Sequence, residues 1–72
     1  MNININLLKS KLALKSKSIP DLAQDIGMNK STFYRKINGD SDFTRKEIND
    51  IVCLLELNQE DMCAIFFIQK VS

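Results

Sequence analysis

The chain has 72 residues, of which 44% are apolar and 26% are charged, with two Gly and one Pro. This length predicts a single domain over residues 1–72 with a small core, and the composition is typical of a folded domain rather than a disordered one. No apolar run approaches the roughly 20 residues needed to cross a membrane. The first residues lack the basic and apolar regions of a secretory signal, so we expect a cytoplasmic protein.

The net charge of +1 conceals an uneven distribution along the chain. Residues 1–46 hold nine of the ten Lys and Arg and four of the nine acids, a net charge of +5, whereas residues 47–72 have a net charge of −4. A basic half is typical of proteins that bind phosphates. Solvated helix surfaces explain the lysines equally well, so charge alone does not decide between these interpretations.

The sequence shows no motif for catalysis or metal binding. It contains no His, and Cys53 and Cys63 lack the spacing of a zinc site. We predict that both cysteines are buried as small apolar side chains rather than joined in a disulfide. The acids are interpreted as helix caps and surface residues, so the chain is predicted not to be an enzyme and to need no cofactor or metal.

Two helices are predicted in the first 27 residues. The first begins at about residue 4 or 6 and ends near residue 15, because Leu8 and Leu12 share one face at a spacing of i, i+4. The second begins at Ser18, which forms a capping box with the acid three residues later. It ends at Gly27, which supplies the left-handed residue that closes many helices.

A third helix follows directly and completes a recognisable unit. Asn29 is its predicted N-cap, Phe33 and Ile37 repeat at i, i+4, and Gly39 closes it. Two short helices joined by a glycine-containing turn meet the geometric requirement of a helix-turn-helix, because such helices cross steeply at close range. The sequence therefore predicts a helix-turn-helix over about residues 18–39.

The remainder of the chain is also predicted to be helical. Phe43 is expected to plug the core from a short loop, and a capping box at Thr44 begins a fourth helix that ends near Leu57. Asn58 begins a C-terminal helix over residues 58–69. The predicted fold class is all-α, a compact bundle of five short helices.

The order of these residues resembles that of a known family. Leu22-Ala23, Ile26-Gly27-Met28 and the run from Ser31 to Gly39 are similar to the helix-turn-helix of the Cro/CI-type (XRE-like) repressors, and the likeness extends over nearly the whole chain. The resemblance implies a lambda-repressor-like DNA-binding domain that regulates transcription, as in small phage or mobile-element regulators. The expected partner is double-stranded DNA with a palindromic operator, and the expected role is repression.

By this resemblance, the third helix is the recognition helix, and the residues expected to contact bases are Asn29, Lys30, Ser31, Tyr34 and Arg35. The physical reading agrees, because the N-terminal residues of a recognition helix enter the major groove first. Arg35 lies one turn after Ser31, on the face opposite Phe33. Arginine suits bidentate contact with guanine, and serine serves either base type.

Phosphate contacts are expected on both flanks of this unit, at Lys17, Ser18, Lys36, Arg45 and Lys46. The N-terminus of the second helix offers free N–H groups and a favourable dipole. The resemblance also places Arg45 and Lys46 at positions where such repressors contact the DNA backbone.

Three departures from the family pattern accompany the resemblance. Ile19 stands where many members have a phosphate-binding Gln. Lys36 stands where an aliphatic residue usually packs, a role that we expect Ile37 to take. Leu12 and Ile37 occupy the positions of a buried Arg and Glu in many members, and an apolar pair is a sound substitute.

The C-terminal helix is apolar on more sides than a monomer of this size needs to cover. The residues predicted to contact a second copy are Ile65, Phe66, Phe67 and Ile68. A two-fold pair would set two recognition helices about 34 Å apart, one turn of B-DNA. We therefore predict a homodimer, at least on DNA, with no membrane partner and no evident small-molecule effector.

The main alternative function is a helix-turn-helix that recognises another protein. Such a module would expose apolar residues on the outward face of its third helix. This sequence instead places Lys30, Ser31, Tyr34 and Arg35 there, which favours DNA.

Overall fold

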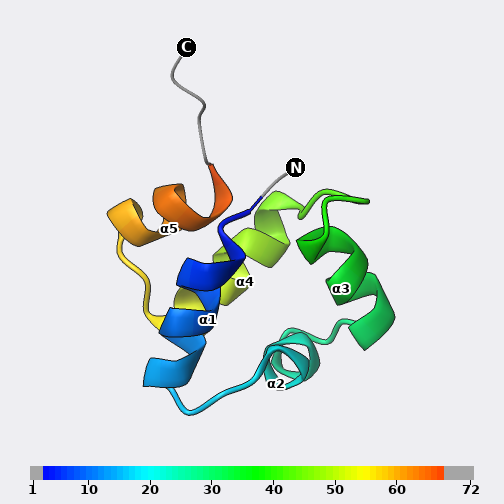
Figure 1. Cartoon of the computed structure of the whole chain (residues 1–72), viewed down its shortest axis with the longest axis horizontal. Coiled ribbons are helices and arrows are strands. Elements are labelled where there is room, and N and C mark those ends of the chain that lie inside the picture. The colour runs from blue at the N-terminus through cyan, green and yellow to red at the C-terminus, as the bar shows by residue number, and fades with distance from the viewer. Residues whose placement is uncertain (1–2, 68–72) are drawn as a thin grey trace.

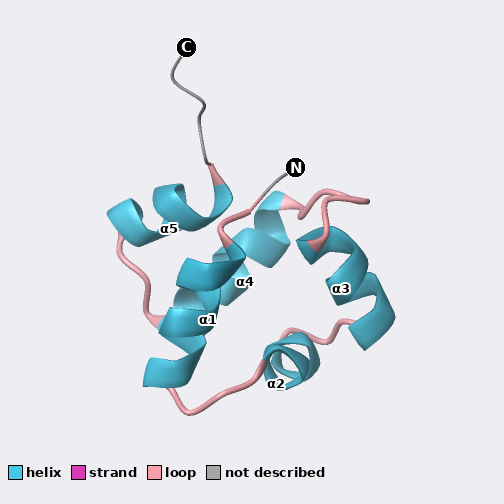
Figure 2. Ribbon diagram, in the orientation of Figure 1, coloured by secondary structure: helices cyan, strands magenta, loops and turns pink. Residues whose placement is uncertain are grey.

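The computed structural model describes residues 3–67 of the 72-residue chain. Within this range it has no strand, and its helices are α1 (Ile5–Leu14), α2 (Ile19–Asp25), α3 (Lys30–Ile37), α4 (Arg45–Leu55) and α5 (Gln59–Phe66) (Figure 2). The predicted all-α class is confirmed. None of these helices is both long and apolar enough to cross a bilayer.

Every helix begins at a polar side chain that accepts a hydrogen bond from a backbone N–H of its own first turn. These N-caps are Asn4, Ser18, Asn29, Thr44 and Asn58. Ser18 and Thr44 form complete capping boxes, because Asp21 and Glu47 accept in return from the backbone N–H of the cap residue. Helices this short are marginal alone, so caps and core burial together must stabilise them.

Four of the helices are followed, within two residues of their ends, by a residue with left-handed backbone. These residues, with their φ values, are Ser16 (56°), Gly27 (73°), Gly39 (91°) and Glu56 (52°). At the end of α2, for example, the Met28 N–H donates to the carbonyl oxygen of Ala23 over 2.8 Å, which closes the turn between α2 and α3. The predicted role of Gly27 is confirmed, whereas Ser16 and Glu56 adopt the same conformation at a steric cost.

One hydrophobic core joins all five helices. Its most deeply buried large side chains are Phe33, Phe66, Leu8, Leu12, Leu22, Ile51 and Ile65. Phe43 packs edge-on against Phe33, with 5.5 Å between ring centroids, and against Phe66 at 5.7 Å. The predicted plug therefore connects α3 to α5 through aromatic contacts.

The arrangement leaves α3 at one side of the molecule. Figure 1 shows α2 almost end-on while α3 is seen from the side, so the two helices cross steeply, and α5 lies at the far side of the bundle. One face of α3 is consequently free of other helices.

The dimer contact predicted from the sequence needs correction. Ile65 and Phe66 are 0% and 1% exposed, so both belong to the core of the single chain and present no surface to a second copy. The apolar residues of this segment divide between two sides: Ile65 and Phe66 point inward, and Phe67, just beyond the end of α5, is 46% exposed. Ile68 and position 69, the last two positions of the predicted helix, lie outside the described residues.

The predicted burial of the two cysteines is also wrong. Cys53 and Cys63 are exposed free thiols rather than buried side chains. On α4 the inward positions are Ile48, Ile51 and Leu55, and Cys53 falls between them on the outer side. The fourth helix also ends two residues earlier than expected.

The strained turn after α1 generates a test of stability. Replacing Ser16 by Gly should raise the free energy of unfolding by about 0.5 to 1 kcal/mol, because glycine adopts positive φ without steric cost. The matched control is Ser10→Gly within α1, which should lower it by a similar amount. Urea unfolding of the two variants checks both signs, and a destabilised Ser16→Gly chain would contradict this description of the turn.

Candidate nucleic-acid interface

The outward face of α3 is polar and open to solvent. Lys30, Ser31, Tyr34 and Arg35 are all exposed, whereas Phe33 on the opposite side is fully buried. With 100° between successive residues, Ser31 and Arg35 lie at the centre of the outward face and Tyr34 lies on one flank, whereas Lys30 is about 60° from Phe33 and is exposed at the start of the helix. The structure thus groups four of the five residues predicted to contact bases.

Asn29, the fifth of these residues, has a local role as well. Its Oδ1 accepts a hydrogen bond from the Ser31 N–H over 2.8 Å and so caps α3. Its amide nitrogen stays available to a ligand. Thr32, to which the sequence assigned no role, is exposed on the flank of the helix beyond Arg35.

Ion pairing separates the basic residues into two groups. The lysines paired with an acid are Lys11, Lys15, Lys17, Lys36 and Lys46. Within residues 3–67, the cations without an ion pair to another described residue are Lys9, Lys30, Arg35 and Arg45. Two of these four, Lys30 and Arg35, belong to α3, so this helix holds positive charge that no acid of the described chain neutralises.

A surface hollow lies between the N-terminus of α2 and Tyr34. Lys9, Lys17 and Ser18 also line it. Lys9 is exposed and was not singled out by sequence reasoning, because only the packing of α1 beside α2 brings it there. The ammonium of Lys17 is already paired with the carboxylate of Asp25.

At Ser18, the carboxylate of Asp21 competes with the predicted phosphate for the backbone N–H. The Ser18 N–H donates to the Asp21 carboxylate over 2.9 Å, and the Ser18 hydroxyl accepts from the Asp21 N–H. The backbone N–H of Ser18 holds the pKa of Asp21 below its ordinary value, so this carboxylate is charged at neutral pH. A phosphate at Ser18 would approach that negative charge.

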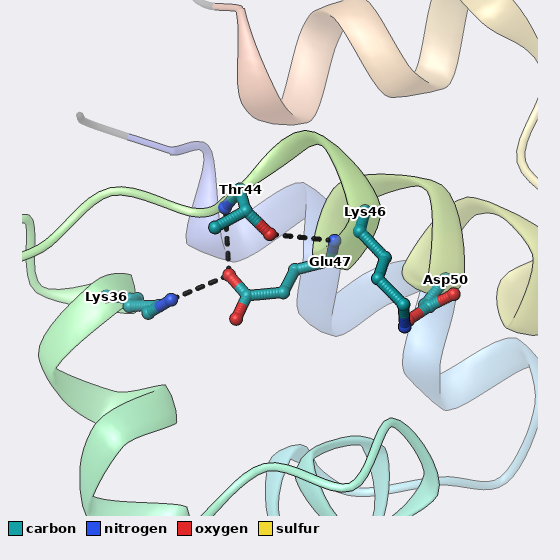
Figure 3. Close-up of polar contacts among 5 residues, drawn as sticks. All are labelled: Lys36, Thr44, Lys46, Glu47 and Asp50. Atoms are coloured by element: carbon teal, nitrogen blue, oxygen red, sulfur yellow. Dashed lines mark hydrogen bonds and ion pairs between the residues drawn. The ribbon is translucent and has the colours of Figure 1, made fainter.

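The two basic residues at the start of α4 lie on different sides of the helix. Arg45 lines a groove with Asn49, Met62 and Phe67. Lys46 is 85% exposed and pairs with Asp50 one turn later, pointing away from Lys36 (Figure 3). Of the two, Arg45 is the freer to bind a phosphate.

Lys36, also predicted to contact phosphate, is largely covered by its own chain and is ion-paired. Its Nζ donates to Glu47 Oε1 over 2.6 Å, and the side chain is only 12% exposed (Figure 3). The same Nζ lies 5.9 Å from the centroid of the Phe43 ring. Glu47 Oε1 also accepts from the Thr44 N–H over 2.8 Å, so one carboxylate oxygen joins the end of α3 to the N-cap of α4.

This double contact shifts the titration of Glu47. Partial burial acts to raise its pKa, but the hydrogen bonds from Lys36 and from the Thr44 N–H outweigh burial and lower the pKa from its ordinary value of 4.5. The carboxylate is therefore charged, and the ion pair intact, at neutral pH.

The remaining departures from the family pattern are accommodated by apolar packing. Leu12 is buried in the core, and Ile37 and Ile19 are half-buried against it. Ile37 thus packs inward as predicted, and Lys36 packs beside it rather than being displaced to the surface.

A helix-turn-helix with a polar, positively charged outward helix defines a class of DNA-binding domain. Consistent with this class, the profile of the Cro/C1-type HTH DNA-binding domain matches residues 7–66, which include most of α1 and all of α2 to α5. The chain belongs to this family of DNA-binding domains. No curated protein and no solved structure matches the chain significantly.

The lowered pKa of Glu47 predicts how stability depends on pH. A carboxylate with a depressed folded-state pKa stabilises the fold above its unfolded pKa, and this contribution is lost as the pH falls through the folded pKa. We expect Glu47→Gln to lower the free energy of unfolding by about 1 to 2 kcal/mol at pH 7, because the Lys36 ammonium and the Thr44 N–H lose a charged acceptor and keep only a neutral one. Urea unfolding should show the difference from wild type shrinking as the pH falls from above the ordinary carboxylate pKa of 4.5 to below it. A difference that stays constant over this range would contradict the assignment.

Proposed function

We propose that the chain is a sequence-specific regulator of transcription that inserts α3 into the major groove of double-stranded DNA. The observation that carries this proposal is the outward face of α3, where Arg35 and Lys30 are exposed and have no ion pair with another described residue. Family membership supports DNA binding by the domain as a whole. Occupying a promoter excludes polymerase sterically and demands no further activity, so we propose repression as the outcome.

Base recognition is assigned to Asn29, Lys30, Ser31, Tyr34 and Arg35. Arg35 lies at the centre of the exposed face, where its guanidinium suits the O6 and N7 acceptors of guanine. Ser31 is one turn closer to the N-terminus of the helix, the end that enters the groove first.

We assign phosphate binding first to the basic residues that have no ion pair with an acid of the described chain, and then to those that are already paired. Arg45 and Lys9 are exposed and unpaired among the described residues, so each is able to bind a phosphate without breaking an existing contact. Lys17 and Lys46 would first have to leave an acid. Ser18 remains a candidate, opposed by the charge of Asp21.

We still propose a homodimer on DNA, but with fewer contact residues than the sequence predicted, because Ile65 and Phe66 are buried. Phe67 is exposed beside the half-buried Met62, in the groove that Arg45 also lines. Burying such an apolar surface against a second copy is favourable, and two-fold symmetry would align two recognition helices with successive turns of the duplex.

Protein recognition through α3 is the less favoured function. The exposed large apolar side chains Leu14, Leu54 and Phe67 lie on α1, on α4 and beyond α5. On α3, only Tyr34 belongs to this group, and its hydroxyl makes it equally suited to phosphate or base contact.

Selection of bound duplexes from a random pool tests the function directly. We expect enrichment of one site whose two halves are inverted repeats about 10 base pairs apart, the spacing that a two-fold dimer imposes. A single, unrepeated enriched site would contradict the dimer but not DNA binding. Absence of any enrichment would contradict the proposed function.

The role of Arg35 is tested on the selected duplex. Arg35→Ala should weaken binding by about 1 to 3 kcal/mol and relax the preference at one base pair, because a bidentate contact is lost. The matched variant is Arg45→Ala, which should weaken binding to all sequences alike and reduce the salt slope by about 0.9. Titrations with cognate and single-mismatch duplexes at several salt concentrations distinguish the two. Equal weakening on every duplex by Arg35→Ala would make Arg35 a phosphate contact.

A further inference from the structure

We propose that Lys36 is a positioning residue that fixes the orientation of the recognition helix through Glu47, and that it is not a phosphate contact. This inference rests on the proposed function and deepens it. The observation behind it is one carboxylate oxygen shared by Lys36 Nζ, on the last turn of α3, and by the Thr44 N–H at the start of α4.

The contact between Lys36 and Glu47 is needed because α3 is otherwise attached to the core mainly through Phe33. Phe33 is its only fully buried residue, and a helix held by one side chain is able to rotate about its own axis. Lys36 and Ile37 lie on either side of the direction of Phe33, one turn further along the helix. Both are half-buried, so together they fix the rotation that Phe33 leaves free.

Small rotations matter at the outward face. Side chains stand about 5 to 6 Å from a helix axis, so a rotation of 15° displaces them by about 1.5 Å. A bidentate hydrogen bond from Arg35 tolerates only a few tenths of an ångström before it weakens. The attachment of Lys36 therefore bears on sequence preference without any contact to DNA.

The environment of Lys36 also argues against a phosphate contact. Its side chain is 12% exposed and its charge is neutralised at 2.6 Å by Glu47, which is itself 24% exposed. Reaching a phosphate would require Lys36 to break this hydrogen bond and to leave the Phe43 ring. It would also leave the Glu47 carboxylate without its charged partner, with the Thr44 N–H still donating to it.

The test compares Lys36→Met, Glu47→Gln and the double variant on the selected duplex and on a scrambled duplex. Methionine keeps an unbranched stem over Phe43 and removes the charge. Glutamine keeps an oxygen that accepts the Thr44 N–H, so the capping box persists while the ion pair is lost. The control is Lys11→Met, which removes the lysine of the ion pair with Asp61 between α1 and α5.

We expect each single variant to weaken binding to the selected duplex about ten-fold, with a smaller loss on the scrambled duplex and an unchanged salt slope. The double variant should lose no more than the worse single variant, because both changes break the same contact. Lys11→Met should bind as wild type does. Thermal melts identify a temperature at which every variant is folded, and Glu47→Gln retains the test if Lys36→Met does not fold.

A phosphate contact predicts the opposite pattern. Lys36→Met would then weaken both duplexes equally and reduce the salt slope by about 0.9, and Glu47→Gln would strengthen binding by releasing the amine. That result, or wild-type affinity in both variants, would overturn the inference alone. A wild-type chain that enriches no duplex from the random pool would overturn the proposed function and this inference with it.

Discussion

The burial of Phe33 is the interaction on which the rest of the structure depends. An eight-residue helix does not persist in water unaided, and Phe33 is the residue of α3 that is wholly removed from solvent. Its ring packs edge-on against Phe43, which in turn packs against Phe66. Helix α3 is thereby connected to the far end of the bundle through three aromatic rings, and its polar face remains exposed.

This arrangement decides which charges are available to a ligand. The front half of the chain is strongly basic, yet the ammonium groups of Lys17 and Lys36 are bound to acids of the same chain. Free positive charge is concentrated at fewer positions, among them Arg35 on α3 and Arg45 on α4. A count of basic residues therefore overstates the number of phosphates that the chain is able to neutralise, and the salt dependence of binding should be correspondingly modest.

Local signals made the fold predictable, because caps and helix ends act over a few residues. Ser18, Asn29 and Gly27 were identified from the sequence and have the expected roles. Long-range pairing was not predictable in the same way. Lys36 was assigned to the surface because nothing near it in sequence indicates Glu47, eleven residues later.

The sequence also failed to predict which side chains are buried in segments where several apolar residues follow one another. Ile65 and Phe66 were assigned to a dimer contact, and only the packing of α5 on the core shows that both are interior. The two exposed cysteines illustrate the converse case, since apolar sequence neighbours do not determine which side of a helix a residue occupies. For the outward face of α3, in contrast, helical spacing from Phe33 was sufficient.

The central claim is that the outward face of α3 reads DNA while its inner side stays attached to the body of the domain. A crystal structure of the chain on its selected duplex tests this most directly. We expect the Arg35 guanidinium within hydrogen-bonding distance of a base edge in the major groove, with Lys36 Nζ still bound to Glu47. A complex in which α3 faces away from the duplex, or in which Lys36 has left Glu47 for a phosphate, would contradict the account.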